Sequence, residues 1–290
     1  MARPLANPAE SAAVPWILRI GVAGCFIGHG AWGIITKAGW LPYFAVGGVS
    51  APTAWELMPW IGRMDVTVGL LALFWPCRAL FVWGVVWGTW TALCRPLAGE
   101  SCWEFVERAG NYGVPLALLV AAGWPGALFR RINRWPIFAS PDAAPAKPPG
   151  SSRPWLPAAA PAASLALVLR AVTFLVLAGH AGCTLMEASA SFRHNYVALW
   201  PHAPALGIAV FGWFELGLAL AALFRPGTVL LLVVVAFKFA TESLFLFAHA
   251  PIWEVMERFG SYTAPLALAV LLAVSPALSA EPAAPIERPA

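Results

Sequence analysis

The sequence is poor in charged residues: Asp, Glu, Lys and Arg together make up 11% of its 290 residues. An average soluble domain has roughly 25% charged residues. The remainder is strongly apolar, with 60% hydrophobic residues and a mean hydropathy of +0.73. So few charges cannot solvate the surface of a soluble protein of this length. The composition excludes a soluble enzyme, a disordered chain and a coiled coil, and it predicts a polytopic membrane protein.

Several common motifs are also missing. The sequence has no C-x-x-C, no phosphate-binding glycine loop, no H-E-x-x-H and no acyl-transfer motif. The net charge of +4 does not indicate a nucleic-acid partner, because helical membrane proteins keep excess Lys and Arg in their cytoplasmic loops. The first fourteen residues contain Pro4 and Pro8 and no apolar stretch, so we expect no cleavable signal peptide.

Long apolar runs dominate the rest of the chain. A membrane-spanning helix needs about 20 mostly apolar residues, and eight candidate runs are present. They are continuously apolar and not alternating, which favours helices over a barrel. The predicted fold class is therefore an all-α integral membrane protein with eight transmembrane helices. The predicted spans are Trp16–Ile35, Met58–Trp75, Ala79–Cys94, Asn111–Phe129, Ala162–Met186, Ala205–Phe224, Gly227–Leu244 and Tyr262–Leu278.

The distribution of basic residues predicts the orientation in the membrane. An even number of spans places both termini on one side. Arg130, Arg131 and Arg134 directly follow the fourth predicted span, and clusters of this kind stay in the cytoplasm. We therefore expect a multi-pass protein of the inner (cytoplasmic) membrane with both termini cytoplasmic. The lipid bilayer is its expected partner, and a redox partner subunit is an additional candidate.

The chain contains an internal repeat. The segment from Trp103 to Leu118 recurs from Trp253 to Leu268 at an offset of 150 residues, and Asp65 aligns with Glu215 at the same offset. Each copy holds four predicted spans, so both copies insert the same way up, related by a pseudo-two-fold axis along the membrane normal. We predict a tail at 1–14, two parallel four-helix repeats at 15–133 and 162–280, a Pro/Ala-rich cytoplasmic linker at 134–161, and a tail at 281–290.

Polar residues of both copies are predicted to meet in the outer third of the membrane. His29 lies ~21 Å from the cytoplasmic end of its span, which leaves ~9 Å to the outer boundary. Asp65, on the next span, lies ~10 Å from that same boundary. His180 and Glu215 repeat this pair. Three interpretations stay open: a hydrogen-bonded pair that fixes two helices, a site for ligand binding or proton transfer, and axial haem ligation by the two histidines.

The motif Trp-Glu-x-x-Glu-Arg precedes the fourth and eighth spans. Its first acid and its arginine are four residues apart and can pair along a helix. One interpretation is a short interfacial helix anchored by its tryptophan. The other is a lid whose second acid faces the site, with a nearby tyrosine as hydrogen-bond donor or as part of an aromatic belt. The candidate residues are Glu104, Glu107, Arg108 and Tyr112 in the first copy, and Glu254, Glu257, Arg258 and Tyr262 in the second.

Other polar residues of the spans have simpler explanations. Arg19 and Arg170 lie near the cytoplasmic ends of their spans, where they can snorkel to phosphate headgroups. Lys238 and Glu242 are four residues apart and are expected to neutralise each other, or else to mark the working half of the duplication. Their counterparts in the first copy are Gly88 and Ala92. The spacing of Cys94 and Cys102 permits a disulfide without arguing for one.

Short motifs in both copies resemble the DoxX-like family of small four-helix membrane proteins, although typical members have one four-helix unit. The resemblance implies roles near quinone-linked sulfur oxidation and redox stress, and members include a subunit resembling that of thiosulfate:quinone oxidoreductase. The Trp-Glu-x-x-Glu-Arg motif is not part of the family pattern. The residues that carry the resemblance are Leu18-Arg19-Ile-Gly21, Gly28-His29-Gly30, Gly62, Asp65, Gly69-Leu70-Leu71, Pro76 and Arg78, and in the second copy Leu169-Arg170, Gly179-His180, Glu215-Leu-Gly217 and Pro226.

Three functions fit these patterns. The first, which we favour, is a redox-associated protein that binds a quinone or a similar apolar ligand at the outer polar site, as a candidate membrane subunit of a quinone-linked oxidoreductase. The second is a transporter for a small solute or ion, which the parallel repeats suit. The third is a scaffold or assembly subunit without chemistry of its own.

Overall fold

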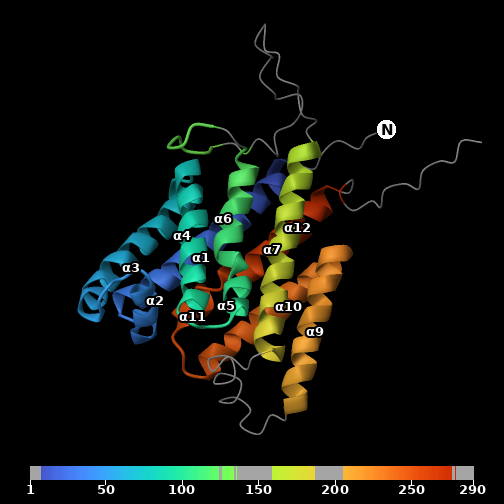
Figure 1. Ribbon diagram of the computed structural model, residues 1–290. Helices are drawn as coiled ribbons and strands as arrows, with labels where there is room; N and C mark the ends of the chain where they lie inside the picture. Colours follow the sequence, from blue (N-terminus) through green and yellow to red (C-terminus); the bar gives the residue numbers. More distant parts are fainter. Residues whose placement is uncertain are drawn as a thin grey trace, which may run out of the picture.

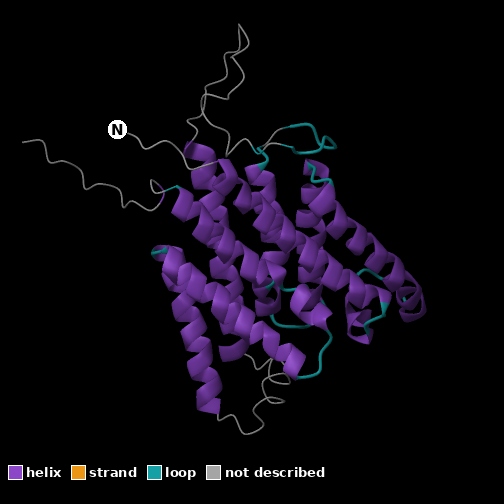
Figure 2. Cartoon of the chain, turned by 180° about the vertical axis from the view of Figure 1, so that it is seen from behind, coloured by secondary structure: helices purple, strands orange, loops and turns teal. Residues whose placement is uncertain are grey.

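The computed structural model describes residues 8–123, 126–133, 135, 159–186, 205–275 and 278. Within these residues the chain is helical and contains no strand (Figure 2). Most of the predicted linker and the C-terminal tail lie outside the described residues. The predicted N-terminal tail is helical from Pro8 onward, because the first helix begins there.

Apart from η1 and α2, which have no counterpart among the described residues, helices follow one another in the same order in the two parts of the chain (Figure 1). Five of them are long and apolar enough to span a membrane, namely α1, α3, α7, α9 and α10. The first part contains α1 (Pro8–Ile34), η1 (Ala38–Trp40), α2 (Leu41–Val46), α3 (Ala51–Phe74), α4 (Arg78–Leu97), α5 (Cys102–Glu107) and α6 (Ala109–Ala121). The second contains α7 (Ala159–Leu185), α9 (Ala205–Phe224), α10 (Thr228–Phe247), α11 (Ile252–Met256) and α12 (Phe259–Val274).

The fourth and eighth predicted spans correspond to short helices. Helix α6 has 13 residues and α12 has 16, which gives lengths of only ~20 Å and ~24 Å against a ~30 Å hydrocarbon core. The fourth span was predicted to continue to Phe129, but α6 ends at Ala121 and Gly123 follows in the left-handed region with φ 72°. Helix α4, at the third predicted span, is also not among the five apolar helices. It has 20 residues, and its sequence includes Arg78 and Arg95.

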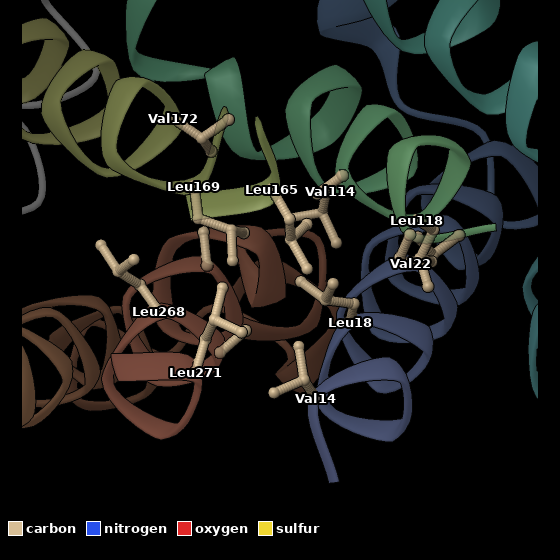
Figure 3. Close-up of a cluster of buried hydrophobic side chains, with 14 of the residues drawn as sticks. Val14, Leu18, Val22, Val114, Leu118, Leu165, Leu169, Val172, Leu268 and Leu271 are labelled. Carbon is tan, nitrogen blue, oxygen red and sulfur yellow. The ribbon is translucent and has the colours of Figure 1, made fainter. Parts of the chain in front are cut away.

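Helices α1 and α7 hold the two parts of the chain together. Helix α1 packs against α3 and also against α11 and α12 of the second part, whereas α7 packs against α9 and also against α5 and α6 of the first. Leu18, Val114, Leu169 and Leu268 meet in the buried core between these helices (Figure 3). Gly110 and Gly260 face each other at its centre, where a Cβ atom on Gly110 would lie 2.9 Å from the Gly260 Cα. Small residues of this kind allow close helix contact.

Arg19 in α1 and Arg170 in α7 make equivalent contacts. Arg19 donates from Nε to the Ala72 carbonyl at 2.9 Å, and Arg170 donates to the Leu223 carbonyl at 3.2 Å. Both carbonyls lie in the last turn of the neighbouring helix, where they have no partner within the helix. These contacts are with protein carbonyl groups, and contact of the arginines with lipid phosphates stays a prediction. They cap the ends of α3 and α9.

The bundle has two distinct ends. At one end the turn between α3 and α4 is joined to the loop at 126–133, because the amide of Ile132 donates to the Pro76 carbonyl at 2.8 Å and the amide of Ala79 donates to the Leu128 carbonyl at 3.0 Å. Helices α2, α5 and α11 lie at the opposite end (Figure 1). We call the end with α2, α5 and α11 the site end.

Candidate functional site

His29 and Asp65 form a hydrogen-bonded pair between α1 and α3. The distance from His29 Nδ1 to Asp65 Oδ2 is 2.8 Å, and the His29 ring stacks on Trp40 with its centroid 4.4 Å away. Asp65 is buried, whereas the His29 side chain is 24% exposed. Because the aspartate occupies Nδ1, Nε2 is the His29 nitrogen left for another partner.

The corresponding residues of the second part pair differently. Glu215 accepts a hydrogen bond from Lys238 at 3.3 Å, not from His180. His180 Nδ1 lies 2.9 Å from the Val176 carbonyl oxygen, and Nε2 lies 3.2 Å from Glu242. Lys238 Nζ also lies 3.1 Å from Glu242. The expected pairing of Lys238 with Glu242 is therefore present, within a larger buried network that His180 joins.

The two Trp-Glu-x-x-Glu-Arg motifs form α5 and α11 and the turns that follow. Arg108 lies 2.8 Å from Glu104, and Arg258 lies 3.0 Å from Glu254, as the four-residue spacing predicted. Each arginine also pairs with the second acid of its motif, Glu107 or Glu257. These contacts fix each arginine at the bend between the short helix and the helix that follows.

Tyr112 and Tyr262 brace the same bends. The Tyr112 hydroxyl donates to the Phe105 carbonyl at 3.3 Å, and the Tyr262 hydroxyl donates to the Val255 carbonyl at 3.4 Å. Each bond joins the first turns of α6 or α12 to the shorter helix before it, α5 or α11. The tyrosines were candidate donors to the site, and the structure instead places their hydroxyl groups on backbone carbonyls.

Each short helix docks against the other part of the chain, next to a histidine. A Cβ on Gly28 would lie 2.5 Å from the Glu257 amide nitrogen, and one on Gly179 would lie 2.2 Å from that of Glu107. The repeated Gly-His pair therefore has a physical reason: the glycine admits the neighbouring backbone and the histidine follows it into the site. Glu107 also lies 3.7 Å from His180, so the contact crosses between the two parts.

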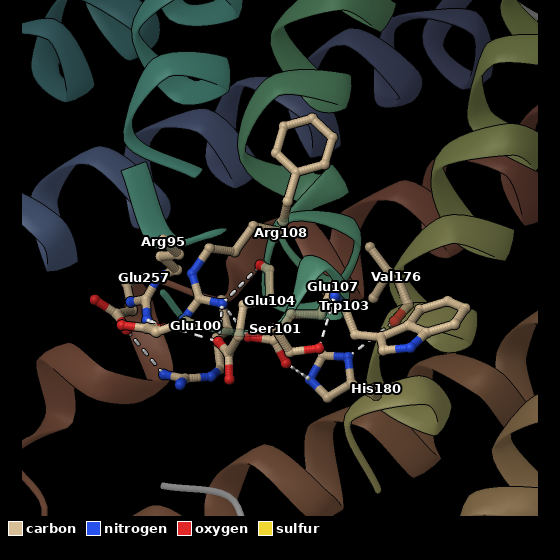
Figure 4. Close-up of polar contacts among 12 residues, drawn as sticks. Arg95, Glu100, Ser101, Trp103, Glu104, Glu107, Arg108, Val176, His180 and Glu257 are labelled. Carbon is tan, nitrogen blue, oxygen red and sulfur yellow. Dashed lines mark hydrogen bonds and ion pairs between the residues drawn. The ribbon is translucent and has the colours of Figure 1, made fainter. Parts of the chain in front are cut away.

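These residues surround a cavity of about 250 Å³ at the site end. Its polar lining includes equivalent residues of both parts, and its apolar wall, which is mostly aromatic, belongs to the first part. The lining includes His29 and His180, Glu107 and Glu257, Arg108 and Arg258, and Asn111 and Ser261, with Trp40, Tyr43, Phe44, Trp87 and Trp90 as the aromatic wall. Figure 4 shows the polar contacts around Glu107, Arg108 and His180.

A second polar cluster at the cavity was not predicted. Arg95 Nη1 lies 2.9 Å from the Tyr43 hydroxyl, 3.1 Å from Glu100 and 3.6 Å from Glu104, and Tyr43 donates to Glu100. The cluster ties α2 to the end of α4. One sequence signal exists, since Arg95 directly follows the third predicted span, Ala79–Cys94. No signal indicated Tyr43, because residues 38–46 were assigned to no element.

The acids of the α5 and α11 bends differ in protonation behaviour. Burial raises the pKa of Glu107, but Arg108, His180 and Arg258 outweigh burial and lower it to about 2. The pKa of Glu254 is also lowered, because Arg258 and Lys37 outweigh its burial. The pKa of Glu104 is raised, chiefly by burial and by the neighbouring Glu107 charge. Glu107 therefore remains ionised at neutral pH and holds the arginines in place.

The contacts of the histidines and cysteines bear on the metal and disulfide interpretations. Both ring nitrogens of His180 lie within 3.2 Å of protein oxygen atoms, so haem ligation by His180 would require these contacts to break. No cluster of three or more metal-ligating side chains occurs among the described residues. Cys94 and Cys102 are free thiols, and Cys94 lines the cavity.

No family model, no curated protein and no solved structure matches this chain.

Proposed function

We propose that the chain is a redox-associated, multi-pass protein of the inner membrane that binds a quinone, or a similar flat apolar ligand with carbonyl oxygens, in the cavity at the site end. The observation that carries the proposal is the position of His29. Its ring lies at an aromatic cavity wall, its Nδ1 is held by the buried Asp65 at 2.8 Å, and its Nε2 is left for a ligand.

The architecture supports this proposal. We infer two parallel four-helix repeats with eight membrane helices, including the shorter α6 and α12, and with both termini cytoplasmic. The reciprocal contacts of α1 with α12 and of α7 with α6 support the repeat. So do the equivalent Arg19 and Arg170 caps. Arg130 and Arg131 lie at the end opposite the cavity, which favours an outer-leaflet position for the site. The DoxX-like resemblance agrees with a quinone-linked role.

The cavity chemistry suits a ring with carbonyl groups. Aromatic side chains stack on flat ligands and supply most of the buried contact area. A volume of about 250 Å³ is slightly below the range of roughly 300–1,000 Å³ for drug-sized ligands, so it fits a single head group. Buried oxygen atoms need donors, and the lining provides Arg108, Asn111 and the Trp87 indole N–H. The Trp87 Nε1 atom is buried and has no hydrogen-bond partner among the described residues.

Titration with a short-chain quinone tests the proposal. Purified protein in mild detergent is titrated with ubiquinone-1, and binding is followed by quenching of tryptophan fluorescence, because three tryptophans line the cavity. We expect saturable binding that His29→Ala and Asp65→Asn each weaken about tenfold, as expected for one lost hydrogen bond to a polar ligand. Trp213→Phe is the matched control, since Trp213 is 64% exposed and does not line the cavity. Unchanged affinity in both site variants would refute the proposal.

A further inference from the structure

The two parts of the chain differ where α4 and α10 pass the site. The positions of Gly88 and Ala92 in α4 correspond to those of Lys238 and Glu242 in α10. Gly88 has no side chain, and a Cβ there would lie 2.8 Å from the Asn111 carbonyl oxygen. Lys238 and Glu242 are instead full-length, charged and at most 2% exposed. The second part therefore buries two charged groups that the first part lacks.

The Glu242 carboxylate lies close to two polar side chains of the second part. It lies 3.2 Å from His180 Nε2 and 3.0 Å from Arg258 Nε. The Lys238 ammonium, at 3.1 Å, balances its charge. Two cationic side chains and a histidine therefore surround this carboxylate.

The equivalent side chains of the first part have no such carboxylate beside them. His29 and Arg108 correspond to His180 and Arg258, and both line the cavity. Among the described residues, His29 Nε2 and Arg108 Nε have no hydrogen-bond partner. Ala92 cannot supply one. The Arg108 Nε–H group donates, and His29 Nε2 donates when the ring is protonated, since its Nδ1–H group faces Asp65. A ligand oxygen that faces both atoms is therefore the expected partner.

The apolar side chains near the site also differ between the two parts. Phe211 and Phe237 contact each other in the second part, with ring centroids 5.3 Å apart. Their counterparts Ile61 and Trp87 both line the cavity in the first part. The space between α3 and α4 is therefore open to a ligand, while the corresponding side chains of α9 and α10 touch.

We infer that the ligand places an oxygen-bearing head group against His29 Nε2 and Arg108 Nε, at the position that the Glu242 carboxylate occupies in the second part, so that the chain binds one ligand and not two. The inference rests on the proposed function for the presence of a ligand. The second part is then a closed copy of the site, in which a side chain of the protein replaces the ligand oxygen. His180, although it borders the cavity, serves to hold Glu242 and Glu107.

Substitution of Ala92 tests the proposed oxygen position separately from the presence of a ligand. Ala92→Glu supplies the missing carboxylate, and Ala92→Met adds a side chain of similar length without an oxygen acceptor. In full-length protein in detergent we expect the Ala92→Glu variant to melt at a higher temperature than the Ala92→Met variant, because only the carboxylate satisfies His29 and Arg108. Equal melting temperatures, or a more stable Ala92→Met variant, would overturn the inference.

Ubiquinone-1 binding provides the second readout. Wild-type protein is expected to bind one molecule per chain, and Ala92→Glu is expected to weaken binding at least about tenfold. Two molecules per chain, or undiminished binding to Ala92→Glu, would also overturn the inference. If wild-type protein bound no quinone while Ala92→Glu remained more stable than Ala92→Met, the proposed function would fail and the acceptor position would stand, for a ligand of other chemistry.

Discussion

Replacement of Lys238 by Met should destabilise the protein strongly. Lys238 is 1% exposed, and its ammonium is the one ion-pair partner of Glu215 among the described residues. Glu242 keeps Arg258 and His180 when Lys238 is lost, but Glu215 does not keep a partner. Removal of one member of a buried pair costs about 3–5 kcal/mol. At about 2–4 °C per kcal/mol for a large domain, the melting temperature should fall by roughly 6–20 °C.

Thermal unfolding in detergent, followed by intrinsic tryptophan fluorescence, measures this change. Arg225→Met is the matched control, because Arg225 is exposed on the neighbouring helix end and its loss should change stability by about 0.5 kcal/mol or less. The double variant Lys238→Met/Glu215→Gln should recover much of the loss, since it removes the orphaned charge. A single variant within 1 °C of wild type, or a double variant less stable than the single one, would refute the reasoning.

Three further outcomes are expected. Gly110→Val should prevent the close contact with Gly260, so the variant should lose about 2 kcal/mol or more of stability. Gly39→Ala should not, because a Cβ at Gly39 has no neighbouring atom within 4 Å; equal melting temperatures of the two variants would contradict the packing. Glu107 has its pKa lowered to about 2 in the folded state, so its stabilising contribution is complete above its unfolded pKa of about 4.3 and is lost as the pH falls toward 2. Between pH 6 and pH 2.5 the melting temperature of Glu107→Gln should therefore fall less steeply than that of the wild type, and an equal fall in both proteins would argue against this role. Trp87→Phe should weaken ubiquinone-1 binding about tenfold through loss of the indole N–H, while Trp83→Phe, which is outside the cavity lining, should not; equal affinities would remove Trp87 from the site.

The sequence allowed prediction of contacts that follow from periodicity and depth. The i,i+4 pairs of Arg108 and Arg258 follow from helical spacing, and the meeting of His29 with Asp65 follows from their similar depth in adjacent apolar runs. These predictions depend on one or two helices whose geometry is fixed by hydrogen bonding within the helix. Five apolar helices agree with a multi-pass membrane protein, although the predicted count of eight spans stays a prediction.

The remaining contacts depend on choices between competing partners. Glu215 aligns with Asp65, yet it pairs with Lys238, because an ammonium group buried nearby attracts it more strongly than a neutral imidazole does. Tyr43 and Arg95 are 52 residues apart, and nothing in either segment predicts their contact. The carbonyl partners of Arg19 and Arg170 were missed for a related reason: the free carbonyls at a helix end are backbone groups, which leave no mark in the sequence.

The exchange of short helices between the two parts has a consequence for synthesis. Lys37, at the end of the first membrane helix, pairs with Glu254, 217 residues later in the chain, and the face of Gly28 is covered by the turn after α11. At roughly 5–20 residues per second, the ribosome needs roughly 10–45 s to supply that covering segment. During this interval the newly inserted α1 presents an uncovered glycine face and a histidine to its surroundings. Insertion machinery, lipid or a second nascent chain must cover this surface, and a translational stall between the two halves would prolong its exposure.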